Sequence, residues 1–224
     1  NLFILGGAPS QALDLTFILD GSYSFGDVSI SAGSFPAGSK LTIILVNGFD
    51  GQAAGGSGGR GEDVVYESES DSFIFSPPVN GVDAGIVYDA NGVDTDIYFS
   101  GSTPSIAFPV ADGYIRAPSG GAGGFNHTGT APNYTSGNGG NGGDGRAGGT
   151  GGNAGIASGG SIVAGVAGSN GEIDGTGTGW GLAGANNNAV GGAAGSGVID
   201  GLNSLGLPPT VTFFGDTPSR YING

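Results

Sequence analysis

The first fifty residues alternate between apolar and polar positions in the way that short β-strands do. Apolar or alternating runs lie at 13–19, 25–31 and 41–46, and the last of these is continuous and ends at Asn47-Gly48. A turn rich in Pro and Gly separates the second run from the third. The pattern predicts a β-rich attachment region over residues 1–52.

Short apolar runs return between residues 62 and 118, which we interpret as a β-rich insert. The runs that predict strands are Val64–Tyr66, Phe73–Phe75, Ile86–Tyr88, Ile97–Phe99, Ile106–Phe108 and Tyr114–Ile115. Asn91-Gly92 lies between two of them and predicts a β-hairpin, because this dipeptide favours tight turns between antiparallel strands. Residues 202–224 form a C-terminal β segment with a strand predicted at Val211–Phe214.

Glycine replaces the apolar pattern elsewhere and recurs with a period of three. Within 137–155, two of the three phases are almost entirely Gly, and the third holds Asn138, Asn141, Asp144, Ala147, Thr150 and Asn153. An α-helix repeats every 3.6 residues and a β-strand every two, so neither explains the pattern. The left-handed extended helix, with about three residues per turn, does.

Such a helix makes no internal hydrogen bonds, so its buried N–H and C=O groups need partners in neighbouring chains. Gly allows the necessary close approach because it has no Cβ. Collagen is disfavoured because no Pro lies between Pro132 and Pro208. We therefore expect a polyglycine-II bundle over 119–201, preceded by a first glycine-rich segment over 53–61.

The expected fold is mainly β plus this polyglycine-II helical bundle, with almost no α-helix. The candidate extended helices are 119–125, 137–155, 157–169, 175–184 and 191–201. We expect the longest to fold back near 145–147 into two antiparallel helices. The alternative is a disordered linker rich in Gly and Asn.

Composition narrows the classes of function. The 224 residues include 52 Gly and no Cys or Met, and the net charge is −14 with only five basic residues. Absence of Met even at position 1 favours a fragment or a processed product. The charge argues against binding nucleic acid or an anionic membrane surface. No apolar run approaches the length of about 20 residues that a membrane span requires.

No motif predicts catalysis, a cofactor or a metal. His127 is the only histidine and lacks the context of a catalytic triad, so a surface role is favoured. The run 89–96 has oxygen ligands at alternate positions but lacks the EF-hand spacing and its final Glu. The acidic pair Glu62-Asp63 and the acidic run 67–71 are typical of a solvated edge, and paired carboxylates flanking a sugar are the alternative. Trp180 suits either a packing role or a stacking platform.

Two parts of the chain resemble bacteriophage tail proteins. Residues 32–48, with the turn Phe35–Ser39 and an apolar strand ending at Asn-Gly before a glycine block, resemble a module that recurs in tail fibres. The glycine blocks separated by variable loops resemble the receptor-binding adhesins of T-even-like phages. That resemblance implies a polyglycine-II sandwich whose loops contact the host receptor.

The resemblance implies a non-enzymatic virion protein of the distal tail, exposed outside the cell, that recognises the bacterial surface. Its expected partners are a bacterial outer-surface protein or glycan and other tail-fibre or tail-tip chains, and a homotrimer fits the end of a fibre. The Asn-, Ser-, Thr- and Tyr-rich linkers suit adaptable binding loops. The candidate receptor-binding residues are Phe125, Asn126, His127, Asn133, Tyr134, Asn170, Glu172, Asn186, Asn187 and Asn188.

Two rival functions stay open at this point. A structural or ice-binding polyglycine-II protein would use a flat row of small residues, such as Asn141, Asp144, Ala147 and Thr150. Against it, the known ice-binding bundle of this type has disulfides, and this chain has no Cys. A polysaccharide depolymerase of a tail spike would use carboxylates such as those at 67–71.

Overall fold

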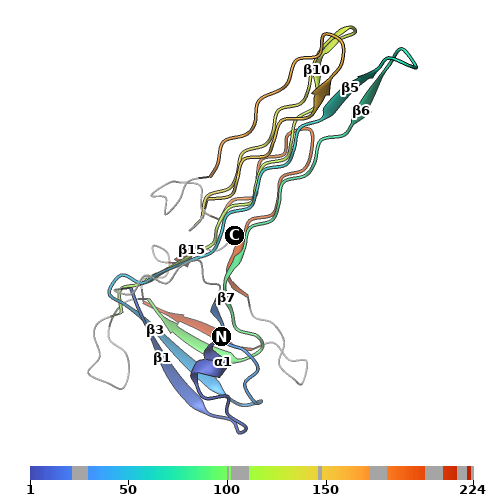
Figure 1. The fold of residues 1–224 in the computed structure, drawn as a ribbon. Coiled ribbons are helices and arrows are strands. Elements are labelled where there is room, and N and C mark those ends of the chain that lie inside the picture. Colours follow the sequence, from blue (N-terminus) through green and yellow to red (C-terminus); the bar gives the residue numbers. More distant parts are fainter. Residues whose placement is uncertain are drawn as a thin grey trace. The chain divides into compact units, whose positions relative to one another are not determined.

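A computed structural model describes residues 1–21, 30–99, 101, 111–145, 148–171, 181–199, 209–215 and 221–222. Its elements are α1 (Leu2–Leu5), β1 (Asp14–Asp20), β2 (Ile30–Ser31), β3 (Lys40–Val46), β4 (Asp50–Gln52), β5 (Asp63–Glu67), β6 (Ser72–Ser76), β7 (Ile86–Asp89), β8 (Asp94–Tyr98), β9 (Tyr114–Arg116), β10 (Thr128–Thr130), β11 (Asn133–Thr135), β12 (Ala157–Ser158), β13 (Ser196–Ile199), β14 (Val211–Phe214) and β15 (Tyr221–Ile222) (Figure 1). One four-residue helix among these elements confirms the prediction of a mainly β chain with almost no α-helix. Of the strand predicted at 25–31, residues 30–31 form β2 and the rest lies outside the described residues, as does the strand predicted at 106–108.

The chain divides into two compact units that each draw on several parts of the sequence. Unit 1 contains residues 1–52, 86–117 and 196–223, and unit 2 contains 53–85 and 118–195. The predicted insert 62–118 therefore contributes to both units.

Every strand pairing among the described residues of unit 1 is parallel. Its three sheets have the strand orders β1-β3-β8-β14, β13-β7-β2 and β15-β9-β4. Each of three passes of the chain adds one strand to each sheet, first β2–β3–β4, then β7–β8–β9 and then β13–β14–β15. Stacked passes of this kind are the coils of a parallel β-solenoid, and β1 extends the sheet that contains β3.

Equivalent residues of successive coils stack to form the apolar core of unit 1. Ile97 lies opposite Ile43 on one side and Phe213 on the other. Ile43 and Ile97 are at most 2% exposed. Alternation of side chains along a strand sends Leu41, Ile43 and Leu45 to the same face of the sheet, so the predicted apolar run 41–46 supplies one layer of this core.

The prediction of a β-hairpin at Asn91-Gly92 is wrong, although a tight turn does form at these residues. Both residues adopt positive φ angles, 46° and 77°, as the dipeptide favours. The strands on either side, β7 and β8, do not pair with each other but belong to different parallel sheets. The turn is a corner of the solenoid, which leads the chain from one sheet to the next.

Tyr88 gives unit 1 a pH-dependent stability above about pH 10. Its side chain is 1% exposed, and burial raises its pKa from 10.0 to about 12, because the phenolate would lose its hydration. Between these values the unfolded state binds fewer protons, so the free energy of unfolding falls as pH rises. We expect the contribution to be complete below pH 10 and reduced by about 3 kcal/mol above pH 12.

Denaturant unfolding at about pH 9 and about pH 11.5 checks this expectation. Tyr88→Phe has no phenol to ionise, so it should lose less stability between the two conditions than the unsubstituted protein does. Equal losses in the two proteins would contradict it.

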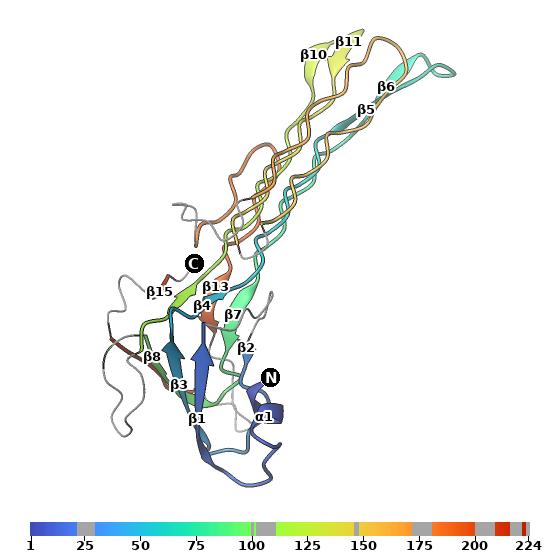
Figure 2. The ribbon, with the colours of Figure 1, turned by 60° about the vertical axis from the view of Figure 1, so that its left-hand side comes forward.

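Unit 2 consists largely of extended segments that lie outside any strand and bond to one another through the main chain (Figure 2). The segments are 53–62, 77–85, 118–126, 136–145, 148–156, 163–171, 181–186 and 188–195. The hydrogen bonds recur at every third residue. For example, the N–H groups of Gly56, Gly59 and Glu62 donate to the carbonyl groups of Ser119, Ala122 and Phe125.

The predicted reversal within 137–155 is confirmed. The N–H groups of Gly149, Gly152 and Gly155 donate to the carbonyl groups of Gly143, Gly140 and Gly137. Residue numbers rise on one side of this ladder and fall on the other, so the two halves are antiparallel. Residues 146–147 lie outside the described residues.

Glycine occupies the positions where one segment touches the next. A Cβ added at Gly140 would overlap the carbonyl oxygen of Ala122, and one at Gly142 would overlap that of Gly149. Segment 136–145 therefore needs two glycine phases because neighbours lie on both sides. Segment 163–171 turns only Gly165, Gly168 and Gly171 inward and exposes most of its other residues, so one phase suffices.

Side chains of the third phase hold neighbouring segments in place. Asn138 Oδ1 accepts a hydrogen bond from the N–H of Val166 at 2.8 Å, while the N–H of Gly139 donates to the Val166 carbonyl at 2.9 Å. The same two-point contact joins Asn141-Gly142 to Ser169, Asn80-Gly81 to Val190 and Asp83-Ala84 to Ala193. In each case a side-chain oxygen of Asn or Asp accepts the hydrogen bond that a main-chain carbonyl group would otherwise accept.

Candidate binding site at the hairpin end of unit 2

Two β-hairpins extend from one end of the segments of unit 2 (Figure 2). In the first, β5 and β6 pair antiparallel, with Tyr66 opposite Phe73 and Val64 opposite Phe75. In the second, β10 and β11 pair so that Gly129 faces Tyr134. Directly opposed residues share a face of a hairpin, so the first hairpin gathers Tyr66, Phe73 and Phe75 on one side.

Rings from both hairpins meet on this side and form what we call the ring platform, defined as Tyr66, Phe73, Phe75, His127 and Tyr134. Phe75 stacks on His127 with 4.6 Å between ring centroids and 29° between planes. Tyr134 meets Phe73, Phe75 and His127 edge-on at 4.9, 5.4 and 5.2 Å. Offset and edge-to-face contacts are the favourable arrangements of aromatic rings. Phe75 is still 39% exposed, so the platform reaches solvent.

A carboxylate fixes His127 within the platform. Glu62 Oε2 lies 2.8 Å from both the backbone nitrogen and Nδ1 of His127. The side chains are 11% exposed for Glu62 and 28% for His127. A carboxylate only accepts hydrogen bonds, so Nδ1 is the nitrogen that carries the proton, and in the neutral ring Nε2 is an acceptor.

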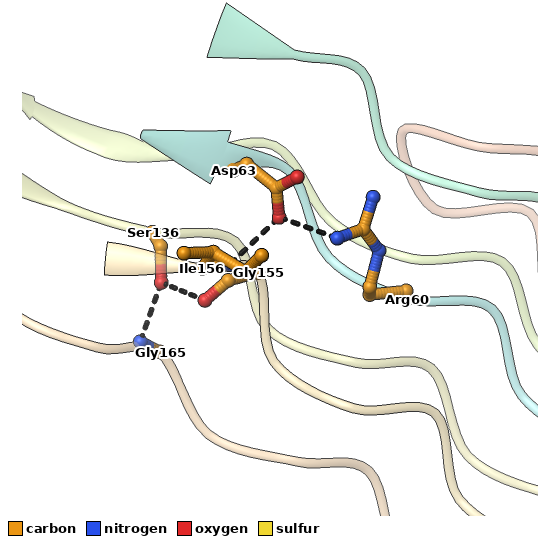
Figure 3. A network of polar contacts seen from close by, with 6 residues as sticks. All are labelled: Arg60, Asp63, Ser136, Gly155, Ile156 and Gly165. Carbon is orange, nitrogen blue, oxygen red and sulfur yellow. Dashed lines mark hydrogen bonds and ion pairs between the residues drawn. The ribbon is translucent and has the colours of Figure 1, made fainter. Parts of the chain in front are cut away.

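A second network of polar contacts joins the extended segments next to the hairpins (Figure 3). Asp63 Oδ1 accepts hydrogen bonds from Arg60 Nη1 at 2.8 Å and from the N–H of Ile156 at 2.7 Å. Ser136 Oγ donates to the Gly155 carbonyl at 2.7 Å and accepts from the Gly165 N–H at 2.9 Å. The serine hydroxyl thus bridges two main-chain groups of separate segments.

Ser136→Ala should lower the free energy of unfolding by about 2 kcal/mol, because two main-chain groups beside a residue that is 2% exposed lose their partner. Urea unfolding measures the change, with Ser158→Ala as the matched control at an exposed serine with no side-chain hydrogen bond among the described residues. Equal midpoints for the two variants would show that Ser136 contributes nothing as a bridge.

The turn of the first hairpin is acidic. Glu67, Glu69 and Asp71 are exposed, and Asp71 adopts a φ of 51°. The Tyr66 hydroxyl donates to Asp71 Oδ1 at 2.7 Å, and this hydrogen bond raises the pKa of Tyr66. Ser70 Oγ donates to Glu67 Oε2 at 2.7 Å. The carboxylates of this turn therefore place negative charge next to the first hairpin's rings.

The structure brings some predicted receptor-binding residues together and separates others. His127 and Tyr134 join the ring platform, and Phe125, Asn126 and Asn133 are exposed beside or within the second hairpin. Asn188 Oδ1 accepts from the Asn126 N–H, so the turn at Asn186, Asn187 and Asn188 lies at this end too.

Hydrogen bonds occupy several of the predicted asparagines. Asn186 Oδ1 accepts from Gly191, and Asn187 Nδ2 donates to the Gly123 carbonyl. Asn170 lies on segment 163–171, which leads away from the hairpins, and its Oδ1 accepts a hydrogen bond from the Gly151 N–H. Glu172 lies outside the described residues.

Glu62, Tyr66, Phe73 and Phe75 are missing from the predicted set, although the two strands of the first hairpin were predicted. Alternation within Phe73-Ile74-Phe75 indicates that both phenylalanines share a face. That the second hairpin would cover this face could not be predicted, because residues 66 and 134 are far apart in sequence and no local pattern links them.

The residues proposed for an ice-binding row are divided between two segments, and Ala147 lies outside the described residues. Asn141 lies on segment 136–145 and Thr150 on the antiparallel segment 148–156. Asn141 Oδ1 accepts from the Ser169 N–H, and the Thr150 hydroxyl donates to Ser57. An ice-binding row would need outward-facing groups in register. Asn141 and Thr150 instead lie on different segments, and both side chains already make hydrogen bonds within the protein.

Comparison with known proteins identifies no relative. No protein-family model, curated protein or solved structure matches the chain. Within the described ranges, no cluster of three or more His, Cys, Asp or Glu side chains could hold a metal ion. No helix in that part of the chain is both long and apolar enough to cross a membrane.

Proposed function

We propose that this chain is a receptor-binding protein of a bacteriophage tail tip, and that it presents its binding loops on a polyglycine-II bundle. In this proposal the chain recognises the bacterial surface during adsorption and is not an enzyme. It would act at the distal end of the tail beside other tail chains, where a homotrimer fits the end of a fibre.

The hydrogen-bond period supports the polyglycine-II part of the proposal. Main-chain bonds recur every third residue in parallel and antiparallel ladders alike, such as 56/59/62 with 119/122/125 and 149/152/155 with 143/140/137. Glycine lies at the contacts, where any Cβ would strike a neighbouring carbonyl group. Both features are what a lattice of three-residue helices requires.

The ring platform is the observation that supports a role in binding the bacterial surface. Four rings of the two hairpins and the ring of His127, which directly precedes β10, gather at one end of a framework whose main chain is tied together at every third residue. Exposed aromatic groups on a rigid support are typical of binding surfaces, since little conformational entropy is lost on binding. The framework depends on glycine and the backbone, so loop residues are free to vary with the receptor.

Binding of the purified, labelled chain to a panel of bacteria tests this function. The panel should include mutants that lack single outer-membrane proteins or have truncated lipopolysaccharide. We expect saturable binding to one host, loss of binding in one mutant and competition with phage adsorption. A folded chain that binds no member of a panel containing its host would overturn the proposal and favour a structural role.

A further inference from the structure

Resting on the proposed function, we propose that the ring platform binds uncharged sugar rings of a bacterial surface glycan. A sugar ring has an apolar C–H face and a rim of hydroxyl groups. It therefore suits a site that offers exposed aromatic surface beside a few placed hydrogen-bonding groups.

The exposed part of the platform supplies the apolar surface. Phe75 is 39% exposed, and the His127 side chain against which it stacks is 28% exposed. Tyr134 buttresses both rings from the side, with planes at 84° to each. A flat ligand would find apolar ring surface at the exposed parts of Phe75 and His127.

His127 supplies a hydrogen-bond acceptor of fixed position. Its Nδ1 is engaged by Glu62, so Nε2 of the neutral ring is left to accept a hydrogen bond from a hydroxyl group. The structure gives no other side-chain hydrogen bond to His127 among the described residues. A sugar hydroxyl is a donor that this acceptor can recognise.

Charge excludes the anionic classes of glycan. Glu67, Glu69 and Asp71 are exposed on the turn of the first hairpin, and the Tyr66 hydroxyl binds Asp71 directly. No Lys or Arg belongs to either hairpin, and the chain as a whole carries a charge of −14. Like charges brought together at an interface are unfavourable, so phosphorylated or uronate sugars should be rejected.

The test uses the full chain and the ring signals of its single histidine, which need no assignment. We would follow the His127 signals by NMR while adding methyl glycosides of glucose, galactose, mannose and N-acetylglucosamine, and the O-polysaccharide of the bound host. Glucuronate and glucose 6-phosphate serve as anionic counterparts. We expect a saturable shift with at least one uncharged ligand and none with the anionic pair.

Substitutions on the two faces of one strand locate the site. Phe75→Ala should weaken binding about tenfold, and Phe75→Leu, which keeps an apolar side chain and so protects folding, should weaken it comparably. Ile74→Ala changes a residue on the opposite face of β6 that is somewhat more exposed than Phe75, and it should leave affinity within about twofold. Equal losses for Ile74→Ala and Phe75→Leu would overturn the assignment to the platform.

The outcomes for this ligand and for the proposed function are distinguishable. Cell binding that is lost with one outer-membrane protein, without any sugar-induced shift at His127, would overturn the glycan and leave the adhesin in place. A specific sugar-induced shift at His127 without binding to any cell would support the sugar site and overturn the proposed adhesin.

Discussion

Replacing Gly140 by alanine is expected to lower the free energy of unfolding of unit 2 by about 3 kcal/mol. The added Cβ would overlap the carbonyl oxygen of Ala122 and lie 2.5 Å from that of Gly123. Both oxygens belong to main chain, which cannot rotate away as a side chain can. Segment 136–145 also bonds to 53–62 and 148–156, so it cannot move aside without breaking other ladders.

A competing effect of the same substitution is smaller. Alanine restricts the unfolded chain more than glycine does, which stabilises a protein by about 0.4–1 kcal/mol where the native conformation tolerates it. At Gly140 the steric cost exceeds this gain, so the net change is destabilising. Denaturant unfolding gives the magnitude, and hydrogen exchange of the Gly140 and Gly152 amides should show whether the ladders open.

Asn153→Ala is the matched control for Gly140→Ala. Asn153 is exposed, and its side chain makes no hydrogen bond among the described residues. Alanine there should change stability by no more than about 0.5 kcal/mol. If Gly140→Ala were as mild, the segments would be too loosely packed for the close approach that the glycine period implies.

Sequence periodicity predicts the extended segments of unit 2 but not their neighbours. Glycine phases identify which edges of a segment are buried, because only glycine fits there. They carry no information on which carbonyl lies opposite, and Gly140 bonds to Gly59 and to Gly152 at very different separations along the chain. The sequence pattern places small polar side chains on the third phase, but it does not indicate that Asn138 and Asn141 accept hydrogen bonds from the main chain of segment 163–171.

The solenoid of unit 1 shows how insertions can hide a repeat. Lys40–Ile44, Asp94–Tyr98 and Thr210–Phe214 follow the same alternation and stack in register. Passages through unit 2 separate these coils, so the period is irregular along the sequence. The local turn signal at Asn91-Gly92 fits a hairpin as well as a corner, since both use the same backbone conformations.

Removing the carboxylate beneath the ring platform is the second large effect that we expect. Glu62→Ala should lower the free energy of unfolding by about 3 kcal/mol, because the backbone N–H and Nδ1 of His127 both lose their acceptor. The value is at the lower end for two hydrogen bonds to a charged group, since the His127 side chain is partly exposed. Urea unfolding measures the loss, and Glu69→Ala, at an exposed carboxylate of the same unit, should leave stability unchanged.

Glu62→Gln separates the charge of this side chain from its shape. The amide oxygen can still accept from His127, but neutral hydrogen bonds are roughly half as strong as charge-assisted ones, so about half of the loss should remain. The ring signals of His127 should shift in Glu62→Ala and move less in Glu62→Gln, because the ring is held by one acceptor. If both variants kept the stability and the His127 signals of the parent protein, the packing of Phe75 and Tyr134 alone would orient the ring. Glu62 would then have no part in presenting the platform.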